Sequence, residues 1–318
     1  MNLTDLRATA DALRNELSRT VVGQRDAVDL MLVALFARGH VLLEGPPGTA
    51  KTLLARSLAA TLDLQFGRIQ FTPDLMPGDI LGTSLFDFST NEFRLVRGPI
   101  FCDVLLADEI NRAPPKSQAA LLQAMNEGVV TLDGKDNTLG ETFFVIATQN
   151  PIEQQGTYPL PEAQLDRFLF KLVLDFPDAA DEQAILRMGA DRPLSTGGGA
   201  PDLTPQIGAG ALSEARACVD TVRLDDDILG YIVSMTRATR ESSDLSYGAS
   251  TRAADALAAA VRAAAALDGR DYAIPDDVKR LFLPAMRHRV VLSPTAEIEG
   301  RGAADVLAHV SAQVEAPR

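Results

Sequence analysis

A glycine-containing segment that ends in a lysine and a threonine is the first group of residues suited to chemistry. It lies between an apolar run that begins at Val41 and a segment with leucines at four-residue spacing. In such a loop the glycines let backbone N–H groups converge on phosphate oxygens, and the helix that follows offers its positive end. We predict that this loop binds a nucleoside triphosphate through Gly45, Pro46, Pro47, Gly48, Thr49, Ala50, Lys51 and Thr52.

The loop departs from the strict phosphate-binding motif at one position, where Ala50 stands in place of the glycine before the lysine. In this motif the lysine, here Lys51, reaches the β- and γ-phosphates, and the threonine, here Thr52, supplies a Mg²⁺ ligand. A degenerate match to a short motif also arises by chance, so the prediction depends on further elements downstream.

Two adjacent carboxylates are such an element, because Asp108 and Glu109 end an apolar run that starts at Asp103. At a strand tip, Asp108 is suited to hold Mg²⁺ directly or through water, and Glu109 to polarise a water toward the γ-phosphate. Solvated acids at a strand end are the simpler alternative.

A third apolar run is followed by Gln149 and Asn150. The amide of Asn150 is suited to bind the attacking water or the γ-phosphate. Alternatively, Asn150 is only a turn residue before a proline.

A parallel α/β sheet is the scaffold that the first half of the chain predicts for these residues. Short apolar runs alternate there with helical patterns, which is typical of strands that are buried on both faces and joined by helical crossovers. We predict five parallel strands with the candidate site at their carboxyl ends. The runs cover residues 41–43, 66–71, 104–106, 143–147 and 168–174.

Two further segments of the first half have the pattern of hairpins. Residues 84–88 and 93–96 are apolar runs joined by a short polar link. Residues 129–132 and the run from Phe143 are separated by a polar stretch that contains Asp133-Gly134, and we predict that these two strands pair. Loops on a rigid scaffold are where partner contacts tend to lie.

The second half of the chain predicts a helical domain, because strand-like runs become scarce after residue 177. We predict an α/β nucleotide-binding domain with two hairpin insertions over 1–177 and an all-helical domain over 178–318. Residues 191–210 are rich in Gly and Pro and indicate an exposed loop. The expected helices cover 181–188, 225–240, 251–267 and 276–286, with caps at Ser250 and at Pro275-Asp276.

Composition narrows the classes of protein. Thirty Lys and Arg against 43 Asp and Glu give a net charge of −13, which disfavours general nucleic-acid binding, although a locally basic pore in an assembly is not excluded. Cys102 and Cys218 form no paired motif, and His40, His288 and His309 stand alone, so we expect neither a disulfide framework nor a zinc site.

The most apolar stretch, 30–37, is far shorter than the ~20 residues that span a bilayer, and the N-terminus lacks the apolar core of a signal peptide. We expect a cytoplasmic protein without a membrane anchor.

A family resemblance is carried by five motifs that follow one another in order. They are GPPGTAKT, LLADEINRAPP, FFVIATQNP, YPLPEAQLDRFLFK and GASTRAADAL, and together they resemble the AAA+ ATPases of the MoxR family. The likeness extends from Val21-Val-Gly-Gln24 to the helix of Arg252, and alanine is common in that family where Ala50 stands. The resemblance implies a P-loop NTPase core, a C-terminal helical lid, ATP and Mg²⁺ as ligands, and hydrolysis of ATP to ADP and phosphate.

The resemblance also implies roles for single residues on the ATP side. Val22 and Gly23 match the segment that lies near the adenine, and the two hairpins match the pre-sensor hairpin and the helix insert of this clade. The Walker A positions, the Walker B pair and the first sensor are matched by Lys51 and Thr52, by Asp108 and Glu109, and by Asn150.

Two arginines match positions that contact phosphate in this family. Arg167, in Leu-Asp-Arg-Phe, resembles the arginine finger offered to the ATP of a neighbouring subunit, and Arg252 resembles the second sensor of the lid. A guanidinium is permanently charged and forked, which suits both roles. The alternatives are an ion pair of Arg167 with Glu162 or Asp166 and a helix-surface charge at Arg252. Arg112, just after the carboxylates, is a rival for the finger role.

The function that the resemblance implies is that of a ring, expected to be a hexamer, which uses ATP hydrolysis to remodel a protein client. A partner with a von Willebrand A domain is expected to present the client, for complex maturation or for metal insertion. A DNA-remodelling motor is an alternative, which Asp133 and Asp136 around Lys135 at the hairpin tip disfavour. A magnesium-chelatase-type motor subunit is another alternative. The last is a nucleotide-gated scaffold with little turnover, and the intact Glu109 and Arg167 argue against this scaffold.

Overall fold

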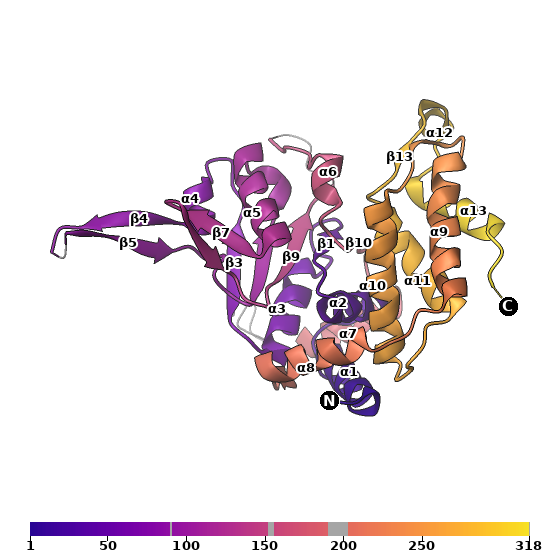
Figure 1. Cartoon of the computed structure of the whole chain (residues 1–318), viewed down its shortest axis with the longest axis horizontal. Helices are drawn as coiled ribbons and strands as arrows, with labels where there is room; N and C mark the ends of the chain where they lie inside the picture. Colours follow the sequence, from indigo (N-terminus) through magenta and orange to yellow (C-terminus); the bar gives the residue numbers. More distant parts are fainter. Residues whose placement is uncertain (90, 152–155, 190–202, 318) are drawn as a thin grey trace.

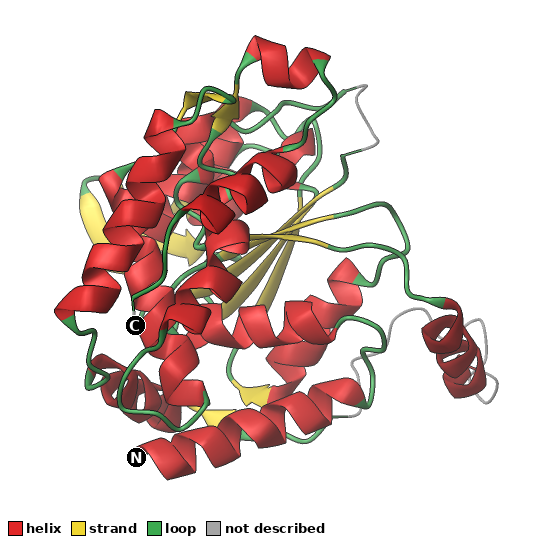
Figure 2. Cartoon of the chain, turned by 90° about the vertical axis from the view of Figure 1, so that its right-hand side faces the viewer, coloured by secondary structure: helices red, strands yellow, loops and turns green. Residues whose placement is uncertain are grey.

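A parallel sheet of five strands forms the centre of the α/β part, in the computed structural model that describes residues 1–89, 91–151, 156–189 and 203–317. The strand order is β10-β1-β9-β6-β3, and every neighbouring pair is parallel. Figure 2 shows the strands running between helices. The sequence-based prediction of five parallel strands is confirmed. Their bounds are Val41–Glu44 for β1, Phe66–Gln70 for β3, Val104–Asp108 for β6, Phe144–Gln149 for β9 and Phe170–Val173 for β10.

The register of the sheet brings the carboxyl ends of its strands to one edge. Glu44 at the end of β1 pairs with Gln149 at the end of β9, and Gln70 at the end of β3 pairs with Asp108 at the end of β6. The segments that follow β1, β6 and β9 therefore start close to one another. This edge is where ligands bind in open parallel sheets.

The helices of the α/β part bury apolar faces against the sheet and against one another. The first helix shows why they form, because Leu6, Leu13 and Leu17 recur at helical spacing and are all buried, while Asn2 caps the N-terminus. The helices and the short connecting strand are α1 (Leu3–Ser18), α2 (Arg25–Phe36), α3 (Lys51–Thr61), β2 (Leu62–Asp63), α4 (Pro77–Leu81), η1 (Ile110–Arg112), α5 (Pro115–Glu127) and α6 (Glu162–Leu165).

The first predicted hairpin is confirmed. β4 (Gly82–Asp87) and β5 (Glu92–Arg97) pair antiparallel with each other and with no other strand of the described chain. Figure 1 shows this hairpin reaching away from the body of the molecule. Phe88 near its tip is 90% exposed and Leu85 is 58% exposed, so the hairpin offers apolar side chains to solvent.

The second predicted hairpin pairs the wrong strands. β7 (Val129–Leu132) pairs with β8 (Lys135–Thr138), and the strand that begins at Phe144 lies inside the parallel sheet between β1 and β6. Asp133 and Gly134 have φ of 50° and 73°, which is the backbone of a two-residue hairpin turn. The chain therefore reverses at once at this turn, long before it reaches Phe144.

The C-terminal part is built mainly from helices, as predicted. Ser250 caps α10 by accepting a hydrogen bond from the backbone of Ala253, so this predicted cap is confirmed. The predicted entry of α11 at Pro275-Asp276 is correct as the start of the helix, but the N-cap residue is Ile274. A short strand pair adds to the helices, because β12 (Leu245–Tyr247) pairs with β13 (Val291–Leu292). The helices are α7 (Ala179–Gly189), α8 (Ala209–Asp220), α9 (Asp226–Glu241), α10 (Thr251–Leu267), α11 (Pro275–Met286), α12 (Pro294–Ile298) and α13 (Ala303–Gln313).

The predicted loop over 191–210 is too long at its C-terminal end, and its part up to residue 202 lies outside the described residues. Ile207 is buried in β11 (Ile207–Gly208), which pairs with β2 of the α/β part, and α8 begins at Ala209. Arg216 of α8 donates two hydrogen bonds to the carbonyl of Leu35 in α2. Residues 207–220 therefore pack on the α/β part, and the domain boundary after residue 177 stays a prediction.

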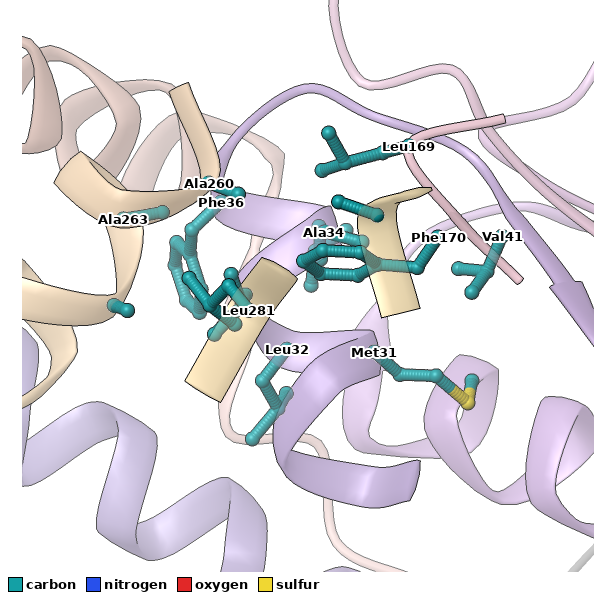
Figure 3. Close-up of a cluster of buried hydrophobic side chains, with 14 of the residues drawn as sticks. Met31, Leu32, Ala34, Phe36, Val41, Leu169, Phe170, Ala260, Ala263 and Leu281 are labelled. Atoms are coloured by element: carbon teal, nitrogen blue, oxygen red, sulfur yellow. The ribbon is translucent and has the colours of Figure 1, made fainter. Parts of the chain in front are cut away.

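The C-terminal helices share one hydrophobic core with the α/β part. Figure 3 shows Phe36 of α2 and Phe170 of β10 beside Ala260 and Ala263 of α10 and Leu281 of α11, and all five side chains belong to a single buried cluster. These two parts are thus packed together rather than joined by a linker alone. Within the described ranges, no helix combines the length and the apolar character that crossing a bilayer requires.

Candidate active site

The loop between β1 and α3 has the backbone shape that lets a phosphate approach. A Cβ at Gly45 would collide with the carbonyl oxygen of Leu174, so only glycine fits there. Gly48 has φ of 88° and open space where a Cβ would be. Ala50 has φ of 61°, in the left-handed region that disfavours alanine by roughly 1–2 kcal/mol. The departure from the motif therefore places a strained residue directly before Lys51.

The backbone amides of this loop are available to an anion. Within the described structure, the N–H groups of residues 48–52 meet no hydrogen-bond acceptor, as is usual for the first turn of a helix. The ammonium of Lys51 donates to the carbonyls of Gly45 at 2.6 Å and Pro46 at 2.8 Å, and burial lowers its pKa. A bound phosphate would give the amides and Lys51 a common acceptor of opposite charge.

Asp108 lies across from the loop at the end of β6, and both of its carboxylate oxygens are engaged. One accepts a hydrogen bond from the Thr148 hydroxyl at 2.7 Å. The other accepts from the Arg68 guanidinium at 2.8 Å and from the Thr52 hydroxyl at 3.4 Å. A hydroxyl next to a carboxylate is a ligand pair that Mg²⁺ takes together with phosphate oxygens and water. Thr52 and Asp108 therefore fit this ion.

Glu109 has a strained backbone, with φ of 56° in the left-handed region. Its N–H donates to the Thr148 hydroxyl at 2.9 Å, and its carboxylate accepts from Gln70 at 3.0 Å and from Arg112 at 2.9 Å. Strain of this kind persists only where the surroundings hold it, and such residues cluster at functional sites. Arg112, the rival for the finger role, is thus paired with the carboxylate of its own subunit.

Asn150 follows β9, the strand between β1 and β6, and is buried. Its backbone carbonyl accepts a long hydrogen bond of 3.5 Å from the Asn111 side chain. Because the neighbouring strands carry the loop and the carboxylates, Asn150 lies at the same edge of the sheet. The structure thus brings together five predicted site residues: Lys51, Thr52, Asp108, Glu109 and Asn150.

Arg167 and Arg252 lie elsewhere. Arg167 is in the turn between α6 and β10 and donates to the carbonyl of Leu122 in α5 at 2.6 Å. Arg252, in the first turn of α10, donates to the Asn126 side chain at 2.6 Å and lies 3.8 Å from Asp166. In the part of the chain that the structure describes, no hydrogen bond or ion pair connects either arginine with the phosphate loop or with the two carboxylates.

Among the described residues, Arg167 forms an ion pair with neither Glu162 nor Asp166. Asp166 pairs with Arg289 at 2.6 Å and more distantly with Arg252, while the Arg167 guanidinium turns to a backbone carbonyl. The Nε atom of Arg167 is buried and has no partner among the described residues. Donors of this guanidinium therefore remain unused within its own subunit.

The segment of Val22 and Gly23 lies beside a cavity of about 680 Å³. Gly23 has φ of 78°, and a Cβ there would press against Pro177 and Asp181. Gln24 donates to the carbonyl of Asp175 at 3.0 Å, which holds the segment against the end of β10. The lining of the cavity includes Gly23, Gln24, Lys171, Asp175, Phe176 and Arg287.

Three side chains that hold the carboxylates were missed from the sequence. Thr148 bonds to both Asp108 and the backbone of Glu109, and Arg68 and Gln70 each hold one of the two carboxylates. Arg68 and Gln70 are two residues apart in β3, so they point to one face of the sheet. That spacing is the only signal in the sequence, because the contacts depend on how β3 aligns with β6.

Comparison with known proteins supports the same assignment over most of the chain. Residues 40–170 match the model of the ATPase family associated with various cellular activities (AAA), and residues 237–310 match the model of the AAA lid domain. A crystal structure of a candidate ATPase from Cytophaga hutchinsonii superposes with a TM-score of 0.90 at 36% identity, covering 99% of this chain and 97% of that one.

Curated relatives extend the likeness. The chain is 44% identical to the Bacillus subtilis protein YeaC, over 98% of this chain and 96% of the relative. It is 42% identical to the Mycobacterium tuberculosis chaperone MoxR1, over 87% and 74% respectively, and 31% identical to the Methylorubrum extorquens protein MoxR, over 93% and 91%. Identity of this degree along nearly the whole length, on the same fold, shows that the chain belongs to the MoxR family of AAA+ ATPases.

Proposed function

We propose that the protein hydrolyses ATP to ADP and phosphate with Mg²⁺, and that it does so as a ring of identical subunits. One observation carries the proposal: the unpartnered amides of residues 48–52 and the ammonium of Lys51 lie at the same sheet edge as Asp108 and Glu109. Donors on one side and carboxylates on the other suit a triphosphate and the water that attacks it.

Each residue of this crevice has a distinct part in the proposed reaction. The amides and Lys51 bind the phosphate oxygens, and Thr52 with Asp108 would hold Mg²⁺, which neutralises charge on the phosphates when bound. Glu109 orients a water and takes its proton, while Gln70 and Arg112 keep the carboxylate in place.

The positions of the two arginines support the proposed ring. Arg167 and Arg252 have no contact with the phosphate loop of their own subunit, and Arg167 keeps donors free. We propose that Arg167 completes the site of a neighbouring subunit, where a guanidinium stabilises the charge that spreads over the transferring phosphoryl group. Arg112 already pairs with Glu109 of its own subunit, which favours Arg167 over Arg112 as the finger.

We propose a protein as the client of the ring, presented by a partner with a von Willebrand A domain, for maturation of a complex or insertion of a metal or cofactor. The name of the Mycobacterium tuberculosis relative, a chaperone, supports this class of client. The net charge of −13 disfavours a nucleic acid. The projecting β4-β5 hairpin, with the exposed Phe88 and Leu85, offers an apolar surface of the kind that contacts proteins.

The variant Glu109→Gln tests the proposed reaction. The amide keeps the hydrogen bonds but accepts no proton, so turnover of ATP should fall by ~10²–10⁴-fold while nucleotide binding stays intact. Phosphate release measures the first quantity and equilibrium titration with ATP the second. Glu127→Gln changes a surface acid at the end of α5 that accepts hydrogen bonds from Gln123, away from the crevice. This variant is the matched control and should leave both quantities unchanged.

The same variant tests the proposed client. A motor that binds ATP without hydrolysing it retains what it works on, so Glu109→Gln should capture client protein in the presence of ATP and release it when ATP is removed. Turnover equal to that of the unchanged protein would remove Glu109 from the reaction. ATP-dependent capture of DNA instead of protein would contradict the client class.

A further inference from the structure

One buried arginine of the lid holds the turn that carries Arg167. Arg289 follows α11 by three residues, and its side chain is 3% exposed. Its Nε donates to the Asp166 carboxylate at 2.6 Å, and its other nitrogens donate to the carbonyls of Asp166 at 3.1 Å, Phe168 at 2.7 Å and Leu169 at 3.1 Å. One guanidinium therefore fixes three residues of the turn on both sides of Arg167.

The neighbouring histidine adds to this attachment. His288 is buried, and its Nε2 lies 2.9 Å from the carbonyl of Phe168. A carbonyl only accepts, so Nε2 carries the proton and donates it. Burial keeps the pKa of His288 well below its usual value, with nearby Arg289 acting in the same direction. The ring is therefore neutral and this contact persists at neutral pH.

A second lid helix reaches the same carboxylate. Arg252 of α10 lies 3.8 Å from Asp166 and donates to Asn126 in α5 at 2.6 Å. Arginines from α10 and from the segment after α11 thus converge on the residue directly before Arg167. Among the described residues, the hydrogen bond of the Arg167 side chain goes to Leu122 of α5 and not to the lid.

We propose that Arg289 is a positioning residue for Arg167, so that the lid of one subunit sets the place of the arginine that this subunit offers to its neighbour. The inference rests on the proposed function, in which Arg167 acts at the adjoining site. It adds a route between subunits: movement of α11 would move the turn, and with it a guanidinium that serves a different ATP.

The geometry explains why an arginine is needed for this role. Five N–H donors in a rigid fork meet four acceptors of one turn, and a lysine, with a single ammonium, cannot meet them all. A shift of about 1 Å at a catalytic group lowers a rate by on the order of 10²-fold. A small displacement of the turn is therefore enough to disable Arg167 without touching the crevice that binds ATP.

A double-mutant cycle with Arg289→Lys and Arg167→Ala tests this inference. We expect Arg167→Ala to lower turnover of the assembled protein by on the order of 10³-fold and Arg289→Lys to lower it by on the order of 10²-fold, each with unchanged affinity for ATP. The double variant should be no slower than Arg167→Ala alone, because Arg289 acts only through Arg167. Arg301→Gln, which breaks an ion pair with Asp244 inside the C-terminal part, is the matched control and should leave turnover unchanged.

Three outcomes would overturn the positioning role: losses that multiply in the double variant, weakened ATP binding in Arg289→Lys, or undiminished turnover in that variant. Hydrogen exchange of the backbone amides of Phe168 and Leu169 is a second readout that needs no activity, and it should be faster in Arg289→Lys than in Arg301→Gln. Equal exchange in both would also contradict the inference. Full turnover in Arg167→Ala would instead count against the proposed finger, and the positioning role would fall with it.

Discussion

At the scale of single residues, two strained positions mark the crevice. Ala50 and Glu109 both have a left-handed backbone, with φ of 61° and 56°. The first precedes Lys51 and the second follows Asp108 and is itself the proposed base, so the strain lies beside the charged groups of the crevice.

The strain at Ala50 leads to a prediction about stability. Ala50→Gly should relieve roughly 1–2 kcal/mol of left-handed strain and lose roughly 0.4–1 kcal/mol through a more flexible unfolded chain. We expect a net gain of roughly 0–1.6 kcal/mol in the free energy of unfolding, measured with urea, and no loss of ATP affinity. Ala60→Gly, in α3, which begins directly after Ala50, should be destabilised by about 1 kcal/mol. Equal losses in both variants would mean that Ala50 carries no strain.

Which residues of the site could be predicted from the sequence depends on how local their contacts are. Lys51, Thr52, Asp108 and Glu109 belong to short motifs next to strands, and the sequence indicates them together with their surroundings. Arg68 was missed because its partner Asp108 is set by the alignment of two strands. No short motif encodes an alignment of that kind.

At the scale of elements, the same distinction separates correct predictions from wrong ones. The three central strands, β1, β6 and β9, were predicted because each is an almost continuous apolar run, as strands buried on both faces must be. The edge strands β3 and β10 mix apolar residues with polar or charged ones and are only partly buried. The partner of β7 was predicted wrongly, although Asp133-Gly134 is itself a strong turn signal. The tight turn implied a partner strand only two residues away, and the polar residues of β8 concealed it.

His40 makes the sheet sensitive to pH. It directly precedes β1, accepts the N–H of Val145 in β9 at 3.0 Å and lies 3.3 Å from the carbonyl of Met125. Burial lowers its pKa from 6.5 to about 4. Between these values the unfolded chain binds a proton that the folded chain does not, so stability is full above pH 6.5 and falls as the pH drops toward 4.

The size of this effect gives a second prediction. The shift corresponds to about 3 kcal/mol, and the lowered pKa of His288 acts in the same direction. Urea unfolding of the unchanged protein should show a free energy that declines steadily from pH 7 to pH 4. His40→Gln, which cannot take up the proton, should show a shallower decline. An identical pH dependence in the two proteins would exclude His40 as a source of it.

At the scale of the whole molecule, the lid and the α/β part form one body around the crevice. They share a core in which Phe36, Phe170 and Leu281 are buried together, and Arg289 ties α11 to the turn before β10. The sequence predicted a helical lid after the sheet but not these contacts, because they join residues more than a hundred positions apart. The proposed ring depends on them, since they set where each subunit presents Arg167.

The central claim is that the edge of the sheet after β1, β6 and β9 binds ATP with Mg²⁺. Calorimetric titration of the folded protein with ATP at millimolar Mg²⁺, beside Lys51→Ala, tests it most directly. We predict one binding event per chain that weakens when Mg²⁺ is withheld and that is lost in Lys51→Ala. Absence of binding by well-folded protein, or equal binding by Lys51→Ala, would contradict the account.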